Sequence, residues 1–243
     1  MLKKIRAYKK LFEIAKEGSF DVYFTLSGFY GKDTAKPLRC LDPIIHGKDR
    51  QLALNETLCR LAKGDPARSM ERLEEERRII QLVLTAGADP NCSSHYGMPD
   101  ESILQSFMSY KKTYGALEVA KADSFMRPKT LDNTFNELVY SLDYYLQDGQ
   151  LFPDFWDTAE EYALYKRDVA DKIKLVCVLF DKGMYPSDPK VRQLLQPIYE
   201  EEQKRIQANA SNQMKKGKAT QKQIVLPDTK ISKHIQAAKS SQK

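Results

Sequence analysis

Apolar residues in this chain recur three or four positions apart, and almost no segment alternates with the period of two that a half-buried strand needs. Three segments share a further pattern: LVLTAGADPN from Leu82, YYLQDGQLFPD from Tyr144 and VLFDKGMYPSD from Val178. Each follows an apolar stretch with a glycine and then, three or four residues later, a proline. A left-handed glycine closes a helix and the proline prevents it from continuing. The pattern predicts an essentially all-α protein in which Gly87, Gly149 and Gly183 close helices.

The intervals between these glycines indicate a repeat of about 33 residues. Gly149 and Gly183 are 34 residues apart, Gly87 and Gly149 are 62 apart, and the interval before Gly87 is similarly long. The two long intervals predict insertions at residues 48–72 and 111–131, where the composition is charged or mixed. A helix pair of this size cannot bury its apolar face alone, so we expect neighbouring pairs to stack.

LVLTAGADPN resembles the end of an ankyrin repeat, where the second helix runs into a G-A-D-P-N turn. LFEIAKEGSFDVYF from Leu11 resembles the first helix, turn and second-helix start of that family. KPLRCLDPIIHGKD from Lys36 resembles its T-P-L-H opening and the helix that follows. The resemblance covers about residues 5–200. It implies a short ankyrin-like helical solenoid with long insertions, which binds a partner protein through its inter-repeat turns and concave face.

The expected organisation is one repeat domain at residues 1–202, followed at residues 203–243 by the end of a cap helix and a tail. Four divergent repeats are predicted, at about residues 5–33, 34–91, 95–154 and 155–188. The later repeats keep only a helix-capping residue, Asp100 or Thr158, at their openings, which predicts irregular stacking. A helical C-terminal cap is expected to start at Asp188 and Pro189, and Pro197 to break or kink it.

Charge is concentrated in the tail. The whole chain has a formal charge of +6, but residues 203–243 carry ten Lys or Arg and one acidic residue, which leaves −3 on the preceding 202. A segment so poor in apolar residues is predicted to be disordered beyond about residue 210. It could bind an anionic surface through Lys215, Lys216, Lys218 and Lys222, or serve only as a solubilising or export-related tail.

Hydrophobic residues make up 42% of the chain and charged residues 30%, with a mean hydropathy of −0.56, which is typical of a soluble globular protein. Its apolar runs are far shorter than the roughly 20 residues that a membrane helix needs, and its N-terminus does not resemble a secretion signal. The four cysteines are scattered and are expected to be free thiols in a reducing compartment. We therefore expect a cytoplasmic protein.

Candidate chemistry is sparse. Cys92 and His95 have the spacing of two zinc ligands, but no second pair completes a site, so we expect no metal and no cofactor. The usual phosphate-binding and serine-hydrolase motifs do not occur. The acidic run ERLEEERR at residues 71–78 is interpreted as a solvated helix, and Cys177 as a buried, inert thiol. No catalytic residue is therefore predicted.

Aromatic residues in or beside the expected inter-repeat turns are the remaining candidates, because such side chains anchor many protein interfaces. They could equally fill gaps between irregular repeats. The partner-binding candidates are Phe29, Tyr30, His95, Tyr96, Phe155, Trp156 and Tyr185.

The function expected from this pattern is non-enzymatic binding of another protein. Divergent repeats, insertions and a lysine-rich tail also resemble ankyrin-repeat effectors of intracellular bacteria, which implies translocation into a host cytosol. Two alternatives stay open. One is an enzyme whose cysteine site, at Cys40, Cys59 or Cys92, is assembled from the insertions. The other is an adaptor that binds an anionic surface through the tail.

Overall fold

The computed structural model describes residues 1–18, 20–25, 35–93, 101–147 and 158–216. It confirms the prediction that the chain is mainly helical. The chain divides into two compact units, Met1–Leu131 and Asp132–Lys243.

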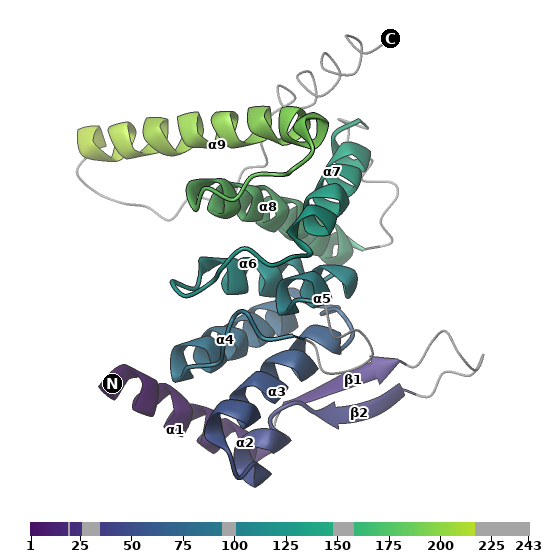
Figure 1. The fold of residues 1–243 in the computed structure, drawn as a ribbon, viewed down its shortest axis with the longest axis vertical. Helices are drawn as coiled ribbons and strands as arrows, with labels where there is room; N and C mark the ends of the chain where they lie inside the picture. The colour runs from purple at the N-terminus through teal and green to yellow at the C-terminus, as the bar shows by residue number, and fades with distance from the viewer. Residues whose placement is uncertain (19, 26–34, 94–100, 148–157, 217–243) are drawn as a thin grey trace. The chain divides into compact units, whose positions relative to one another are not determined.

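The elements of the first unit are α1 (Leu2–Glu17), β1 (Asp21–Thr25), β2 (Ala35–Arg39), α2 (Asp42–His46), α3 (Arg50–Lys63), α4 (Met70–Ala86), α5 (Ile103–Ser109) and α6 (Thr113–Lys121) (Figure 1). The second unit contains α7 (Leu131–Gln147), which starts at the last residue of the first unit, α8 (Ala159–Asp181) and α9 (Pro189–Lys216).

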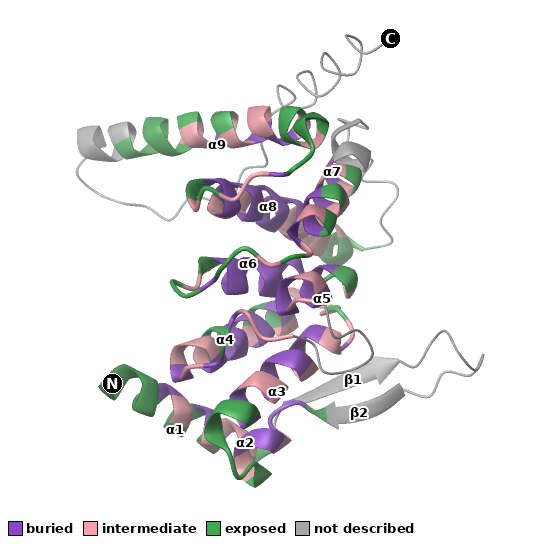
Figure 2. Ribbon diagram, in the orientation of Figure 1, coloured by how far each residue is buried: buried purple, intermediate pink, exposed green. Residues whose placement is uncertain are grey.

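Helices of the first unit pack in successive pairs. Helix α3 packs against α4, α5 packs against α6, and the second pair lies on the first through contacts of α3 with α5 and of α4 with α6. Helix α1 continues this arrangement on the other side of α4, and short α2 joins α1 to α3. The buried positions of these helices face one another along the pairs (Figure 2). Each pair thus covers an apolar face that its neighbour alone would leave in water.

A β-hairpin replaces the second helix that was expected to begin at Asp21. Strand β1 pairs antiparallel with β2, with Asp21 opposite Arg39 and Thr25 opposite Ala35. Helix α1 ends at Gly18, whose φ of 64° is left-handed, and the β-branched and aromatic run VYFT that follows favours a strand. The predicted helix start at Asp21 is therefore wrong. Strands of five residues are too short to show a clear period of two.

The two stretches predicted as insertions are helices of the core. Residues 48–72 contain α3, in which seven of 14 residues are buried, and residues 111–131 contain α6, in which eight of nine are buried. The charged residues of α3 lie at exposed or intermediate positions, whereas Lys112 and Glu118 are buried, so overall composition hid a buried helical face. The prediction that these segments are insertions is therefore wrong, because their helices form the interior of the unit.

Helix ends follow local sequence closely. Gly87 and Gly183 have the predicted left-handed conformation, at φ 115° and 71°, whereas Gly149 lies outside the described residues. Thr158 caps α8, and its side chain and that of Glu161 each bond the other's backbone N–H. The expected cap at Asp100 also lies outside the described residues, and Ser102 caps α5.

The predicted cap helix begins at Pro189, as expected, but it does not break at Pro197. Helix α9 runs through this proline to Lys216 without interruption. Leu195 and Ile198, on either side of the proline, are almost fully buried, and α9 packs against α8. This burial offsets the cost of about 3 kcal/mol that an interior proline imposes on a helix.

Candidate functional site

A buried carboxylate, that of Glu76 in α4, lies at the centre of the first unit. It accepts hydrogen bonds from Lys112 Nζ at 2.9 Å and from the Tyr114 hydroxyl at 2.7 Å. The Nε atom of Arg72 lies 3.4 Å from its other oxygen. Lys112, whose side chain is fully buried, also donates to the carbonyl of Leu61 at 2.9 Å. Through these hydrogen bonds the cluster joins α3 and α4 to the start of α6.

Burial and the Glu76 charge shift the pKa values of Lys112 and Tyr114. Burial lowers the pKa of Lys112, although the neighbouring Glu76 carboxylate opposes the shift. Burial and then the same carboxylate raise the pKa of Tyr114 well above its usual value, so its hydroxyl stays a hydrogen-bond donor. Both the Tyr114 hydroxyl and the Lys112 side chain thus donate hydrogen bonds to the Glu76 carboxylate.

A second buried ion pair links α4 to α6. Arg77 Nε donates to Glu118 Oε1 at 2.9 Å, and Gln81 and Lys121 each donate to the same carboxylate at 3.0 Å. Burial alone would raise the pKa of Glu118, but the hydrogen bonds from Lys121 and Gln81 and the charge of Arg77 outweigh it and lower the pKa. The interpretation of residues 71–78 as a solvated helix is thus wrong for Glu76 and Arg77, which are both buried. The spacing of charged residues within one helix does not reveal that some of them pair with residues of a distant helix.

The loops after α4 and α6 are joined by hydrogen bonds between residues about one repeat apart. Asn91 Nδ2 donates to the carbonyl of Ser124 at 2.8 Å, and Asn91 Oδ1 accepts from the backbone N–H of Met126 at 2.7 Å. The separations of 33 and 35 residues are close to the repeat length that the glycine spacing predicts. Within the α3/α4 pair, Asn55 Oδ1 of α3 accepts from the N–H of Asp89, in the loop after α4, at 2.9 Å. Asn91 is the last residue of the GADPN motif, so sequence could have assigned it this role.

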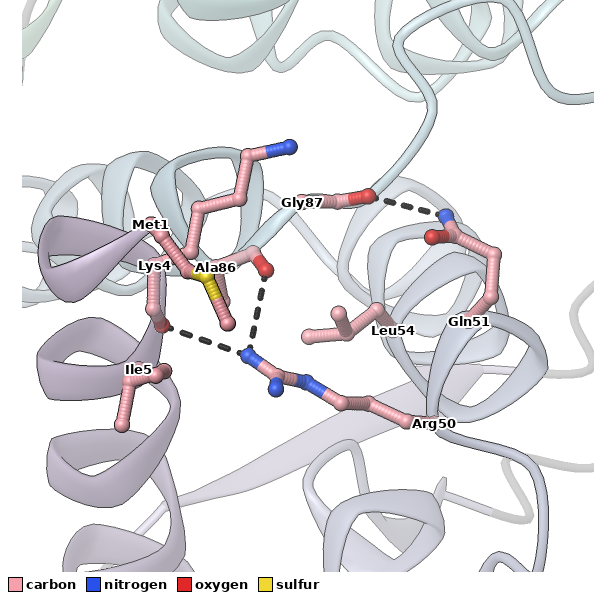
Figure 3. A pocket seen from close by; sticks show the side chains of 8 residues that line it. All are labelled: Met1, Lys4, Ile5, Arg50, Gln51, Leu54, Ala86 and Gly87. Carbon is pink, nitrogen blue, oxygen red and sulfur yellow. Dashed lines mark hydrogen bonds between the residues drawn. The ribbon is translucent and has the colours of Figure 1, made fainter.

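An open pocket of about 390 Å³ lies among the ends of α1, α3 and α4 (Figure 3). Arg50 crosses it and donates to the carbonyls of Lys4 at 3.3 Å and of Ala86 at 3.4 Å, while its guanidinium stacks 4.2 Å above the Tyr8 ring. Gln51 Nε2 donates to the carbonyl of Gly87 at 2.8 Å. The lining consists of Met1, Lys4, Ile5, Arg50, Gln51, Leu54, Ala86 and Gly87.

The surface beside this pocket is both basic and apolar. Five of the first ten residues are Lys or Arg, none is acidic, and all five basic side chains are exposed. Leu2 is 72% exposed and Ile5 46%, although both are large hydrophobic residues in a helix that buries only Ala7 and Leu11. Apolar side chains exposed beside a concave pocket are typical of a binding surface. We call this surface, formed by residues 1–10 and the pocket lining, the N-terminal face.

Most of the residues predicted to bind a partner lie outside the described part of the chain, namely Phe29, Tyr30, His95, Tyr96, Phe155 and Trp156. Of the tail lysines, Lys218 and Lys222 also lie outside it, whereas Lys215 and Lys216 fall in the last turn of α9.

Tyr185 is the one aromatic candidate whose side chain can be placed. Its ring packs edge-on against Phe180, with centroids 5.0 Å apart, and the Arg192 guanidinium lies 4.3 Å from the ring centroid. It is therefore half-buried in the second unit, where it fills space between α8 and α9.

Two of the four thiols, those of Cys40 and Cys177, are in unfavourable surroundings for catalysis. Cys40 is fully buried, donates to the carbonyl of Phe20 at 3.8 Å, and has a pKa that burial raises strongly. Burial likewise raises the pKa of Cys177 to about 12, in agreement with its predicted role as an inert core residue. A thiol attacks as the thiolate, so a raised pKa lowers its reactivity. Within the described ranges, no three His, Cys, Asp or Glu side chains are grouped as metal ligands would be.

A search of protein-family models, of curated proteins and of solved structures returned no match. The ankyrin likeness therefore stays a resemblance carried by the sequence motifs alone. Across the described helices, none has the length and apolar character to cross a bilayer.

Proposed function

We propose that this chain is a non-enzymatic protein-binding module of ankyrin-like construction, and that its N-terminal face binds an acidic segment of a partner protein. The observation that carries the proposal is the basic and apolar surface around the pocket of α1, α3 and α4. Successive packing of the pairs α3/α4 and α5/α6, and the loop hydrogen bonds of Asn91, support the repeat architecture.

The chemistry of the N-terminal face favours a particular kind of partner. Lys4 and Arg50 place positive charge at the pocket, and the side chains of Ile5 and Leu54 form an apolar part of its wall. Burying one large apolar side chain there would contribute about 1.5–3 kcal/mol. Flanking carboxylates would meet the exposed lysines of α1 and would raise the association rate at low salt. An acidic segment with a leucine or phenylalanine fits both features.

The buried ionisable groups support binding rather than catalysis. Glu76 and Glu118 are held by donors of the chain itself, and the thiols of Cys40 and Cys177 have raised pKa values. Groups fixed in this way stabilise a scaffold. As part of the same proposal, the module is a bacterial effector that acts on a host protein in the host cytosol, and the aromatic turn residues around Trp156 extend the contact.

Fluorescence anisotropy with a labelled peptide tests the N-terminal face. The probe carries a leucine flanked by Asp and Glu, and a matched peptide has lysines in place of the acids. We expect the acidic peptide alone to bind, and Lys4→Glu or Ile5→Asp to weaken it at least about tenfold, which corresponds to 1.4 kcal/mol. The control Lys16→Glu makes the same charge change at an exposed position in the last turn of α1.

Equal binding of the two peptides, or insensitivity to both variants, would contradict the proposed face. Binding to phosphatidylserine vesicles without binding to the acidic peptide would also overturn it and assign the surface to membranes. Capture from a eukaryotic lysate with wild type and Trp156→Ala tests the aromatic turn separately. An unchanged set of captured proteins would count against that turn.

A further inference from the structure

Two of the four cysteines, Cys59 and Cys92, lie close to each other in the fold. Cys59 lies in the buried face of α3, 4% exposed, and Cys92 follows α4 in the loop that Asn91 joins to the loop after α6. The Cys59 thiol lies 3.7 Å from the carbonyl of Ser93, the residue next to Cys92. The two thiols are also hydrogen-bonded to each other, a contact that raises the pKa of Cys92. Both are free thiols in this structure.

We propose that Cys59 and Cys92 are a latent redox pair that forms a reversible disulfide tying α3 to the loop after α4. Sequence alone gave no reason to pair them, since they are 33 residues apart and lack C-x-x-C spacing. The fold brings them together because the loop after one helix pair lies against the first helix of that pair. The proposal is independent of the N-terminal face.

The different exposure of the two thiols sets the order of the reaction. Cys92 is partly exposed and meets a small disulfide oxidant such as oxidised glutathione, whereas Cys59 is buried. The Cys92 sulfur, on losing its proton, attacks the oxidant, forms a mixed disulfide and releases one glutathione thiol. The Cys59 sulfur then attacks the Cys92 sulfur, also with loss of its proton, and releases the second glutathione thiol. In total, two thiols are oxidised to one disulfide and one oxidised glutathione is reduced to two thiols.

The raised pKa of Cys92 predicts the rate of this reaction as well. Because the thiolate is the attacking species, oxidation is slow near neutral pH and becomes faster as the pH rises. The disulfide closes a loop that includes the whole of α4 and so restricts the unfolded chain. The oxidised protein should therefore have a higher unfolding temperature than the reduced one.

The test uses the full chain, incubated in a buffer of oxidised and reduced glutathione, alkylated, digested and analysed by mass spectrometry. We expect a cross-linked peptide pair containing Cys59 and Cys92, lighter by two hydrogens than the separate peptides. Dithiothreitol should remove it, and the unfolding temperature should rise on oxidation by several degrees. Cys40→Ser and Cys177→Ser are matched controls, because both of these thiols are buried elsewhere and should leave the cross-link unchanged.

Two single variants separate the roles of the pair. Cys59→Ser should keep the mixed disulfide with glutathione at Cys92, and Cys92→Ser should take up no glutathione at Cys59. A wild-type protein that accumulates the glutathione adduct at Cys92 without an internal cross-link would overturn the proposal. So would a cross-link that joins either cysteine to Cys40 or Cys177 instead.

Discussion

The two units of this protein stabilise their interiors by different means. In the first, buried charges link helices distant in sequence, as in the contacts of Glu76 with Lys112 and of Arg77 with Glu118. The second unit also buries the charged residues Asp171, Lys172 and Glu202, but in ion pairs with residues three or four positions away in the same helix. Between its elements, the Phe180 ring packs against Phe135, Tyr185 and Tyr199, with ring centroids 6.1, 5.0 and 5.4 Å apart. An aromatic cluster thus takes the place that buried ion pairs between helices have in the first unit.

This difference predicts different responses to mutation and to pH. Removing one member of a buried ion pair leaves the other without its counter-charge, which costs more than the lost attraction itself. Trimming an aromatic ring leaves a void whose cost depends on how far the neighbours relax. Four substitutions test this difference between the two units, and they are given from the largest expected effect to the smallest.

Replacing Lys112 by methionine should have the largest effect, a loss of about 3–5 kcal/mol in the free energy of unfolding. Glu76 would keep the nearby Arg72 but would lose the fully buried ammonium at 2.9 Å. Urea unfolding measures the loss, and Lys111→Met is the control because that neighbouring side chain is exposed. If both variants lost the same stability, the ionic cluster would not be a major source of stability in the first unit.

Replacing Glu118 by glutamine should cost about 1–2 kcal/mol near neutral pH, because a charged acceptor becomes a neutral one. The folded protein lowers the pKa of Glu118, so its carboxylate stabilises the fold above the unfolded-state pKa, and this contribution is lost as the pH falls through the folded-state value. The difference between wild type and variant should therefore shrink on acidification below about pH 5. Urea unfolding at several pH values measures this difference, and a constant difference would refute the assigned cause.

Replacing Phe180 by leucine should cost about 1–1.5 kcal/mol, nearly independent of pH between 5 and 8, since no charge is involved. Thermal unfolding followed by circular dichroism provides the measurement. Tyr140→Leu serves as the control, because Tyr140 is 79% exposed on α7 of the same unit. A strong pH dependence of the Phe180 effect would remove the contrast between the two units.

Replacing Asn91 by alanine should have the smallest effect, about 0.5–1.5 kcal/mol, because its hydrogen bonds to Ser124 and Met126 are exposed. Hydrogen exchange should show faster exchange of the Met126 amide, with little change in the amides of α4. The control Asn133→Ala removes an exposed asparagine in the second unit. Unchanged protection at Met126 would show that the side chain does not hold the two loops together.

Local sequence predicted the features whose physics is local. Gly87 and Gly183 adopt the left-handed conformation because only glycine does so without a steric cost, and Thr158 caps α8 because its hydroxyl reaches the backbone of the next turn. The repeat of about 33 residues stays a prediction, and the hydrogen bonds of Asn91 join residues 33 and 35 positions apart. The sequence pattern did not predict the hairpin, because its two strands of five residues are stable only when they pair with each other.

The sequence alone was enough to predict the helical character and the helix ends at Gly87, Gly183, Thr158 and Pro189, because each depends on neighbours within a few turns. Only the tertiary structure decided that Glu76 and Arg77 are buried, that residues 48–72 and 111–131 form core helices, and that the thiols of Cys59 and Cys92 meet. It also placed Lys4, Arg50 and Ala86 around one pocket. These features join residues tens of positions apart, and such contacts form only when whole helices pack.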